Sequence, residues 1–118
     1  CMSALGLERS GIFTTEDKIA EKMIASSEVV GEKLWRLPLG EEYSEAIKSE
    51  VADIKNVGGV GGSRYGTAST AAAFLQEFTD YPWLHIDLAS AIYSSKGKPW
   101  IRVGANGSVV QTIVEYLR

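Results

Sequence analysis

The sequence holds one histidine, and an aspartate follows it two residues later. His85 and Asp87 stand in the stretch "PWLHIDLASAIY", where they alternate with Leu84, Ile86 and Leu88. Residues at positions i and i+2 of a strand share a face, so the imidazole and the carboxylate could bind a metal ion or act as an acid–base pair. A zinc site needs three or four protein ligands, and the chain has no second histidine. The pattern therefore favours a structural contact between the two side chains over a metal site.

A glycine-rich loop is the second candidate, because loops of this kind can cradle phosphate groups. The stretch "NVGGVGGSRYG" lacks the Lys-Ser/Thr pair of a P-loop. A dinucleotide fingerprint built on Gly59 and Gly61 would need a third glycine where Arg64 stands. Arg64 could still contact an anion, and a small phosphate-binding module would rest on this loop alone. The pattern favours a flexible connector instead, in which Gly66 eases the start of the next helix.

Covalent catalysis has little support in the sequence. The chain has no G-x-S-x-G motif, and its one histidine would have to serve any triad. Cys1 is the only cysteine, so no internal disulfide can form, and a reducing compartment fits. Acidic pairs at 16–17 and 41–42 open predicted helices, where the helix dipole explains them without catalysis. These residue types by themselves predict no self-sufficient active site.

Four helices and two strands are predicted to position these residues. Hydrophobic periodicity predicts strands at 2–7 and within 82–93, and helices at 15–30, 41–56, 68–78 and 108–118. Thr14 or Thr15 is expected to cap the first helix and Gly31 to end it, and the segment that contains Pro38 is expected to be extended. The predicted apolar faces consist of Ile19, Ala20, Met23, Ile24 and Val30, then Tyr43, Ala46, Ile47, Val51 and Ile54, then Ala68, Ala71, Ala72, Leu75 and Phe78, and finally Val109, Val110, Ile113, Val114 and Leu117. Two strands make a thin sheet, so either the chain is a small helical bundle or the rest of its sheet lies in sequence outside it.

Composition limits the classes of partner. The 118 residues suffice for one core, and 45% of them are hydrophobic and 23% charged, as in a soluble globular protein. A formal net charge of −3 argues against nucleic acid and anionic membranes, which reward a basic surface. The first residues lack the basic and apolar regions of a secretory signal. We expect a cytoplasmic protein with no nucleic-acid or membrane partner.

Five stretches, taken in order, carry a resemblance to a known family. They are "GEKLWRLPL", "ADIKN", "TAAAFL", "PWLHIDLA" and the closing "VEYL". Each is weak alone, but together they resemble the C-terminal end of the leucyl aminopeptidases, also called cytosol aminopeptidases, over essentially all 118 residues. The resemblance implies an α/β fold, namely the C-terminal portion of a three-layer α/β/α metallopeptidase domain that is helix-rich with few strands of its own. Residues 1–118 would then form an incomplete catalytic domain.

The resemblance also implies a metal-dependent exopeptidase that removes N-terminal residues, commonly leucine, from peptide substrates. In that family two divalent ions, usually zinc, manganese or magnesium, bind the substrate amine, polarise the carbonyl and ready a water for attack. A lysine and several acidic residues hold these ions, including an N-T-D-A-E-G-R motif that is absent here. We therefore expect no metal ligand and no catalytic residue in this chain, which would be inactive without the remainder of the parent chain. The family forms hexamers, which implies a homo-oligomer.

Two residues carry over as substrate-binding candidates. The stretch "HIDLASAI" aligns with the family segment that walls the pocket for the first side chain of the substrate, which implies that Ala89 and Ile92 line this pocket. An apolar wall suits leucine, although both residues could instead be ordinary core residues near the end of a strand. The alternative function for the whole chain is a non-catalytic binding or oligomerisation module.

Overall fold

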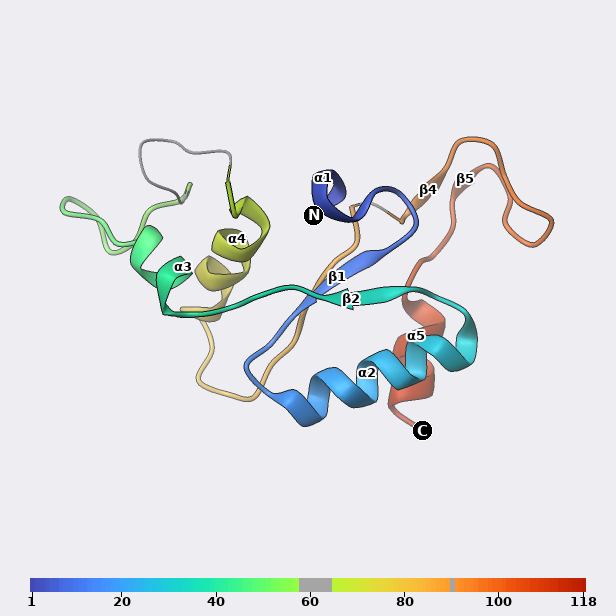
Figure 1. The fold of residues 1–118 in the computed structure, drawn as a ribbon, viewed down its shortest axis with the longest axis horizontal. Coiled ribbons are helices and arrows are strands. Elements are labelled where there is room, and N and C mark those ends of the chain that lie inside the picture. The colour runs from blue at the N-terminus through green and yellow to red at the C-terminus, as the bar shows by residue number, and fades with distance from the viewer. Residues whose placement is uncertain (58–64, 90) are drawn as a thin grey trace.

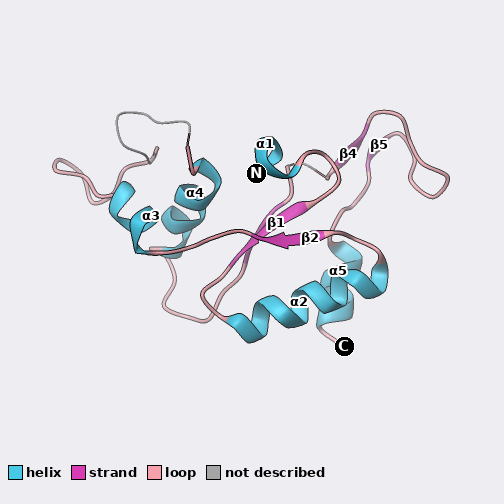
Figure 2. Ribbon diagram, viewed as in Figure 1, coloured by secondary structure: helices cyan, strands magenta, loops and turns pink. Residues whose placement is uncertain are grey.

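The computed structural model describes residues 1–57, 65–89 and 91–118. In these ranges the chain is helix-rich with few and short strands, which confirms the predicted α/β class (Figures 1 and 2). The elements in chain order are α1 (Met2–Leu5), β1 (Ser10–Phe13), α2 (Asp17–Val30), β2 (Leu34–Arg36), α3 (Glu41–Ala46), α4 (Thr67–Gln76), β3 (His85–Asp87), β4 (Tyr93–Ser94), β5 (Gly104–Ala105) and α5 (Val110–Tyr116). Within the described ranges, no helix combines the length and the apolar character needed to cross a membrane.

A three-stranded sheet with β1 in its centre organises the chain. The strand order is β2-β1-β3, with β1 parallel to β2 and antiparallel to β3. Two parallel neighbours need a crossover connection, and α2 supplies it. All four residues of β1 are buried. The prediction of two strands was therefore wrong in number. The strands β1 and β2 are too short for a clear alternation of apolar and polar residues. In addition, β4 pairs with β5 in a small second sheet.

The hydrophobic core lies between this sheet and the two helices α2 and α5, which pack against each other (Figure 1). Ile12 of β1 is fully buried at its centre. The buried cluster consists of Ile12, Ala20, Met23, Leu34 and Val109, and Ile24, Leu84, Ile86, Leu88 and Tyr116 pack against it. The predicted apolar stripe of α2 and the predicted alternation along β3 are thus confirmed.

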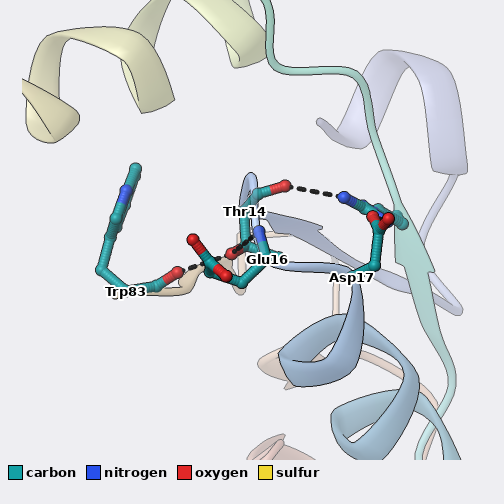
Figure 3. A network of polar contacts seen from close by, with 5 residues as sticks. Thr14, Glu16, Asp17 and Trp83 are labelled. Carbon is teal, nitrogen blue, oxygen red and sulfur yellow. Dashed lines mark hydrogen bonds and ion pairs between the residues drawn. The ribbon is translucent and has the colours of Figure 1, made fainter. Parts of the chain in front are cut away.

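The two ends of α2 differ in how well they were predicted. Gly31 ends the helix in the left-handed conformation, with φ at 77°, as expected. At the other end the cap prediction was wrong, because α2 begins after Glu16, whose side chain makes no capping bond. The Thr14 hydroxyl instead accepts a hydrogen bond from the Glu16 amide (3.0 Å) and donates one to the Trp83 carbonyl (2.7 Å), as Figure 3 shows. Thr14 thereby joins the end of β1 to the segment before β3.

Arg36, at the end of β2, completes this polar network. Its guanidinium donates to the Asp17 carboxylate at 2.7 Å and to the Thr14 carbonyl at 3.0 Å. Asp17, predicted only as a dipole complement in the first turn of α2, therefore also forms an ion pair across the parallel strand connection. Because the Asp17 carboxylate is largely exposed, this ion pair contributes little to the free energy of folding.

The expected buried strand at 2–7 is wrong. Its first residues form the short helix α1, in which the amides of Ala4 and Leu5 donate to the Cys1 carbonyl, and most of this segment is exposed. The sheet position belongs to "SGIF" instead, where Gly11 leaves room for α1. A Cβ atom on Gly11 would lie 2.6 Å from the Cys1 Sγ. A side chain at position 11 would therefore have to displace the Cys1 thiol just before α1.

The helix expected at 41–56 ends ten residues early, at Ala46. The Ser49 hydroxyl accepts hydrogen bonds from the amides of Val51 and Ala52, which replaces the helical pattern with a turn. The Lys55 amide then donates back to the Ile47 carbonyl. Local competition by a serine side chain therefore overrode the apolar spacing of the segment.

The third predicted helix forms as α4, but Ala72 is the one residue of its predicted apolar face that is buried. Its small residues Ser69, Thr70, Ala72 and Ala73 are buried, whereas Leu75 is 44% exposed. Small side chains let α4 approach α3 closely, which decides the buried face. Gly66 caps the helix with φ at 62°, and a Cβ atom there would lie 3.2 Å from the Tyr43 ring of α3, so the prediction that Gly66 eases the start of this helix is confirmed.

The last helix shows the same reversal. Thr112, a polar residue, is fully buried, whereas three residues of the predicted apolar face, Val110, Val114 and Leu117, are 57–75% exposed. Val109 alone of that face is buried, as the N-cap of α5. The existence of the helix was thus predicted correctly from its periodicity, but its orientation was not.

Candidate functional site

β3 positions His85 and Asp87 on one face of the sheet, opposite the core. The His85 ring stacks on Phe13, with ring centroids 5.7 Å apart, and lies 6.3 Å from the Trp83 ring. In the described part of the chain no hydrogen bond joins His85 to Asp87, whose carboxylate instead accepts from the Ala89 amide at 3.2 Å. The expected contact between the pair is therefore electrostatic, without a hydrogen bond, and aromatic rings stack on the imidazole.

The described residues do not suit a metal ion. Among residues 1–57, 65–89 and 91–118, no group of three or more His, Cys, Asp or Glu side chains could hold one. His85 and Asp87 would leave any divalent ion short of ligands. The predictions made for the glycine loop, including those for Gly59, Gly61 and Arg64, lie outside the described residues.

Burial lowers the pKa of His85 below its ordinary value of 6.5, and the nearby Asp87 carboxylate opposes this only in part. Because the unfolded chain then binds the proton more readily, the contribution of His85 to stability is complete above about pH 6.5 and is lost as the pH falls through the lowered pKa. We expect His85→Gln to flatten this acid-side loss. An NMR titration of His85 should show a midpoint below 6.5, and a midpoint at or above that value would contradict the burial argument.

Ala89 and Ile92 lie in the loop between β3 and β4. Neither side chain is buried in this chain, since Ala89 is exposed and Ile92 is 43% exposed. Ordinary core residues of the chain would be covered, as Ile12 is. Two apolar side chains therefore stand open at the end of β3, and their part in a substrate pocket remains a prediction.

Asn106 holds this loop in place. Its backbone amide donates to the Ile92 carbonyl at 3.1 Å, and its side-chain Nδ2 donates to the Ala91 carbonyl at 2.7 Å. Its Oδ1 accepts from the Ser108 amide at 3.0 Å. The sequence analysis predicted no element between residues 93 and 108 and missed Asn106. The available signal was an asparagine followed by glycine, which is typical of turns closed by the side chain.

Glu32, directly after the glycine that ends α2, anchors the start of α5. One carboxylate oxygen accepts from the Val109 amide at 2.8 Å, and the other accepts from the amide and hydroxyl of Thr112 at 3.0 and 2.5 Å. Val109 adopts a left-handed φ of 71°, which is costly for a β-branched residue and is held by this carboxylate. No local pattern predicted Glu32, because its partners are at least 77 residues away.

A groove of about 590 Å³ lies beside the same loop. Ala91, Tyr93 and Asn106 contribute to its lining, together with residues of the turn after α2. Ala89 and Ile92 do not line it. The groove is therefore not the predicted substrate pocket. Asn106 lines the groove and is also bonded to the backbone of Ile92.

Comparison with known proteins gives one consistent family. Residues 1–114 match the catalytic domain of the cytosol aminopeptidase family. A probable cytosol aminopeptidase of Acidobacterium capsulatum is 47% identical over 118 residues, which cover 99% of this chain and 22% of that protein. Leucine aminopeptidase 2, chloroplastic, of Arabidopsis thaliana is 45% identical over 120 residues, covering 100% of this chain and 19% of that protein. The chain thus spans about a fifth of the length of these curated relatives.

Solved structures agree. A mutant of tomato leucine aminopeptidase superposes with a TM-score of 0.86 at 41% identity, covering 98% of this chain and 22% of that one. The bottromycin maturation enzyme BotP, in complex with Mn, superposes with a TM-score of 0.89 at 36% identity, covering 99% of this chain and 26% of that one. Sequence and structure therefore agree over nearly all 118 residues.

Proposed function

Because this chain belongs to the cytosol aminopeptidase family, we propose that it works as the C-terminal part of the catalytic domain of a metal-dependent leucyl aminopeptidase, which hydrolyses N-terminal residues from peptides. The observation that carries this proposal is the agreement with aminopeptidases over almost the whole chain, at 47% identity to one relative. In this proposal residues 1–118 supply scaffold and part of the substrate pocket, and the remainder of the parent chain supplies the chemistry.

Two divalent ions, zinc, manganese or magnesium, would be held by residues outside this chain. The Mn complex of BotP supports a divalent-metal requirement. The described residues offer no ligand cluster for such ions, so we assign no metal ligand and no catalytic residue here. In this proposal the chain contributes to the placement of the substrate.

Ala89 and Ile92 would line the pocket for the first side chain of the substrate. Both are apolar, both follow β3 and both are open to contact. A small and a branched apolar side chain together favour a substrate side chain such as leucine, because apolar surface on both partners is removed from water.

Exposed apolar surface supports contact with the remainder of the parent chain. Leu75 and Phe78, in and just after α4, and Val114 and Leu117, in and just after α5, are 44–75% exposed. Apolar side chains exposed together at the end of a helix are suited to a covering partner. We further propose a homo-oligomer, the hexamer implied by the family, in the cytoplasm, without nucleic-acid or membrane partners.

The proposal is tested by comparing two proteins with the same substrate. We expect the longer protein that carries this chain to hydrolyse a leucine chromogenic substrate when a divalent metal is added, and to lose that activity on chelation. The isolated 118-residue chain should show no metal-dependent activity, since it offers no described ligand cluster. Activity of the isolated chain, or none in the longer metal-loaded protein, would contradict the proposal.

The alternative function is a non-catalytic binding or oligomerisation module. The exposed apolar residues of α4 and α5 support this module as well as they support contact with a parent enzyme. It predicts a longer protein without hydrolysis whose assembly depends on these faces. The same comparison of activities therefore separates the two functions.

A further inference from the structure

We propose that Asn106 is a positioning residue for substrate selection, because it holds Ala91 and Ile92 where Ile92 meets the first side chain of the substrate. This inference rests on the proposed function. Asn106 itself need not touch the substrate, since its contacts are to the backbone of the loop that carries Ile92.

Asn106 is bonded to two successive carbonyl groups of the loop. Its amide donates to the Ile92 carbonyl at 3.1 Å and its Nδ2 to the Ala91 carbonyl at 2.7 Å. The Ala91 amide in turn donates to the Leu88 carbonyl at 3.0 Å, and Leu88 packs on the core. The backbone just before Ile92 is therefore held by the Leu88 carbonyl, just after β3, and by Asn106.

The far side of Asn106 is anchored to the core. Its Oδ1 accepts from the Ser108 amide at 3.0 Å, one residue before Val109. Val109 and Thr112, both at most 1% exposed, are held by the Glu32 carboxylate. A continuous set of hydrogen bonds thus runs from the end of α2, through the start of α5, to the backbone beside Ile92.

The position of Ile92 matters because discrimination between apolar side chains depends on close contact. The Ile92 side chain is 43% exposed, so its place is set by its backbone and not by surrounding core. A pocket wall that shifts away loses contacts with a large substrate side chain but almost none with a small one. Loss of the Asn106 side-chain bonds should therefore weaken selection of leucine over alanine more than it weakens hydrolysis in general.

An amide is the side chain that suits this place, because it donates and accepts at once. Asn106→Asp keeps an acceptor for the Ser108 amide but turns a second oxygen toward the Ala91 carbonyl. This variant therefore loses the side-chain bond to the Ala91 carbonyl while it keeps the turn at Ser108. Asn106→Ala removes both side-chain bonds, and both variants keep the backbone bond from residue 106 to the Ile92 carbonyl.

The experiment uses the longer, metal-loaded protein. The kcat/KM for leucine and alanine chromogenic substrates is measured for wild type, Asn106→Ala, Asn106→Asp and the control Thr14→Val, which loses its bond to Trp83 at the opposite end of β3. We expect both Asn106 variants to lower the leucine-to-alanine ratio roughly fivefold, mainly through a higher KM for leucine, and Thr14→Val to leave it unchanged. In an Ile92→Ala background, Asn106→Asp should lower the ratio no further.

The outcomes separate the two claims. An active wild type whose ratio is unchanged by Asn106→Asp, or is lowered equally by Thr14→Val, overturns the role of Asn106 and leaves the proposed function standing. A further fall of the ratio in the Ile92→Ala background also overturns it, since the effect would not act through Ile92. A wild type without aminopeptidase activity overturns both. If Asn106→Ala does not fold, Asn106→Asp and its double variant carry the test.

Discussion

Replacing Glu32 with alanine should increase the hydrogen-exchange rates of the α5 amides about a hundredfold. The carboxylate accepts three hydrogen bonds, from the amide of Val109 and from the amide and hydroxyl of Thr112. Bonds to a charged group contribute about 1.5–3 kcal/mol each and do not add fully, so we expect a loss of about 3 kcal/mol, or two factors of ten.

Three effects act together at this site. The fully buried Thr112 hydroxyl would lose its acceptor, and a buried polar group without a partner destabilises the fold. The negative charge at the start of α5 would disappear from the end of the helix that favours anions. Val109 would also lose the bond that holds its left-handed conformation. The α5 contact with α2 should open locally before the rest of the chain unfolds.

The measurement is amide exchange by mass spectrometry or NMR on the longer protein, with Glu21→Ala as the matched control. Glu21 is an exposed acid on α2, the helix that Glu32 follows, and its replacement should change exchange in α5 by less than about threefold. Glu32→Gln should fall between the two, because an amide keeps one acceptor and turns a donor toward the remaining amide. Equal exchange in Glu32→Ala and Glu21→Ala would show that the carboxylate does not anchor α5.

Replacing Phe13 with alanine should lower the free energy of unfolding of the sheet by about 3–5 kcal/mol, the usual cost of removing a fully buried aromatic side chain. Phe13 is fully buried at the end of β1, beside the His85 ring of β3. The cost combines lost burial with a cavity under the strand that pairs with both neighbours. Since β1 is the central strand, β2 and β3 should both become less protected.

Phe13→Leu is the matched comparison, because it keeps most of the apolar volume and should cost less than half as much. Denaturant dependence of exchange in β1 and β3 measures both variants. The pKa of His85 gives a second readout, since an opened stack admits water and should move that pKa upward toward 6.5. If alanine costs no more than leucine, or the pKa of His85 does not rise, the stack does not support the sheet as described.

Elements with a complete local signal were predicted well. The helix at α2 has an apolar stripe of nearly four turns and Gly31 at its end, and both features are encoded within the segment itself. The alternation of Leu84, Ile86 and Leu88 likewise predicted β3. The shortening of α3 was missed, because the Ser49 hydroxyl competes with the helix in a way that apolar spacing does not record.

The buried faces of α4 and α5 could not be predicted from periodicity. An apolar stripe shows that a helix has a side to cover but not which neighbour covers it. In this chain α4 packs against α3 and buries small residues such as Ala72 and Ala73, and α5 packs against α2, with Val109 in one cluster with Ala20 and Met23. Leu75 of α4 and Val110 and Val114 of α5 remain exposed, whereas Tyr116 of α5 packs on the core.

The candidate site divides in the same way. Ala89 and Ile92 were reached from the sequence through an ordered set of motifs, and they remain predicted pocket residues. Glu32 and Asn106 were not reached, because Glu32 bonds to residues at least 77 positions away and Asn106 to one 15 positions away.

By itself, the sequence determined the family, the α/β class and the elements whose periodicity is local, since these depend on residues close together in the chain. Only the tertiary structure decided which helix faces are buried, which carboxylate caps α5 and which asparagine holds the loop beside Ile92. The physical reason is that a hydrogen bond requires two groups to be close in space. Glu32 and Thr112 come within bonding distance only after α2 and α5 have packed together.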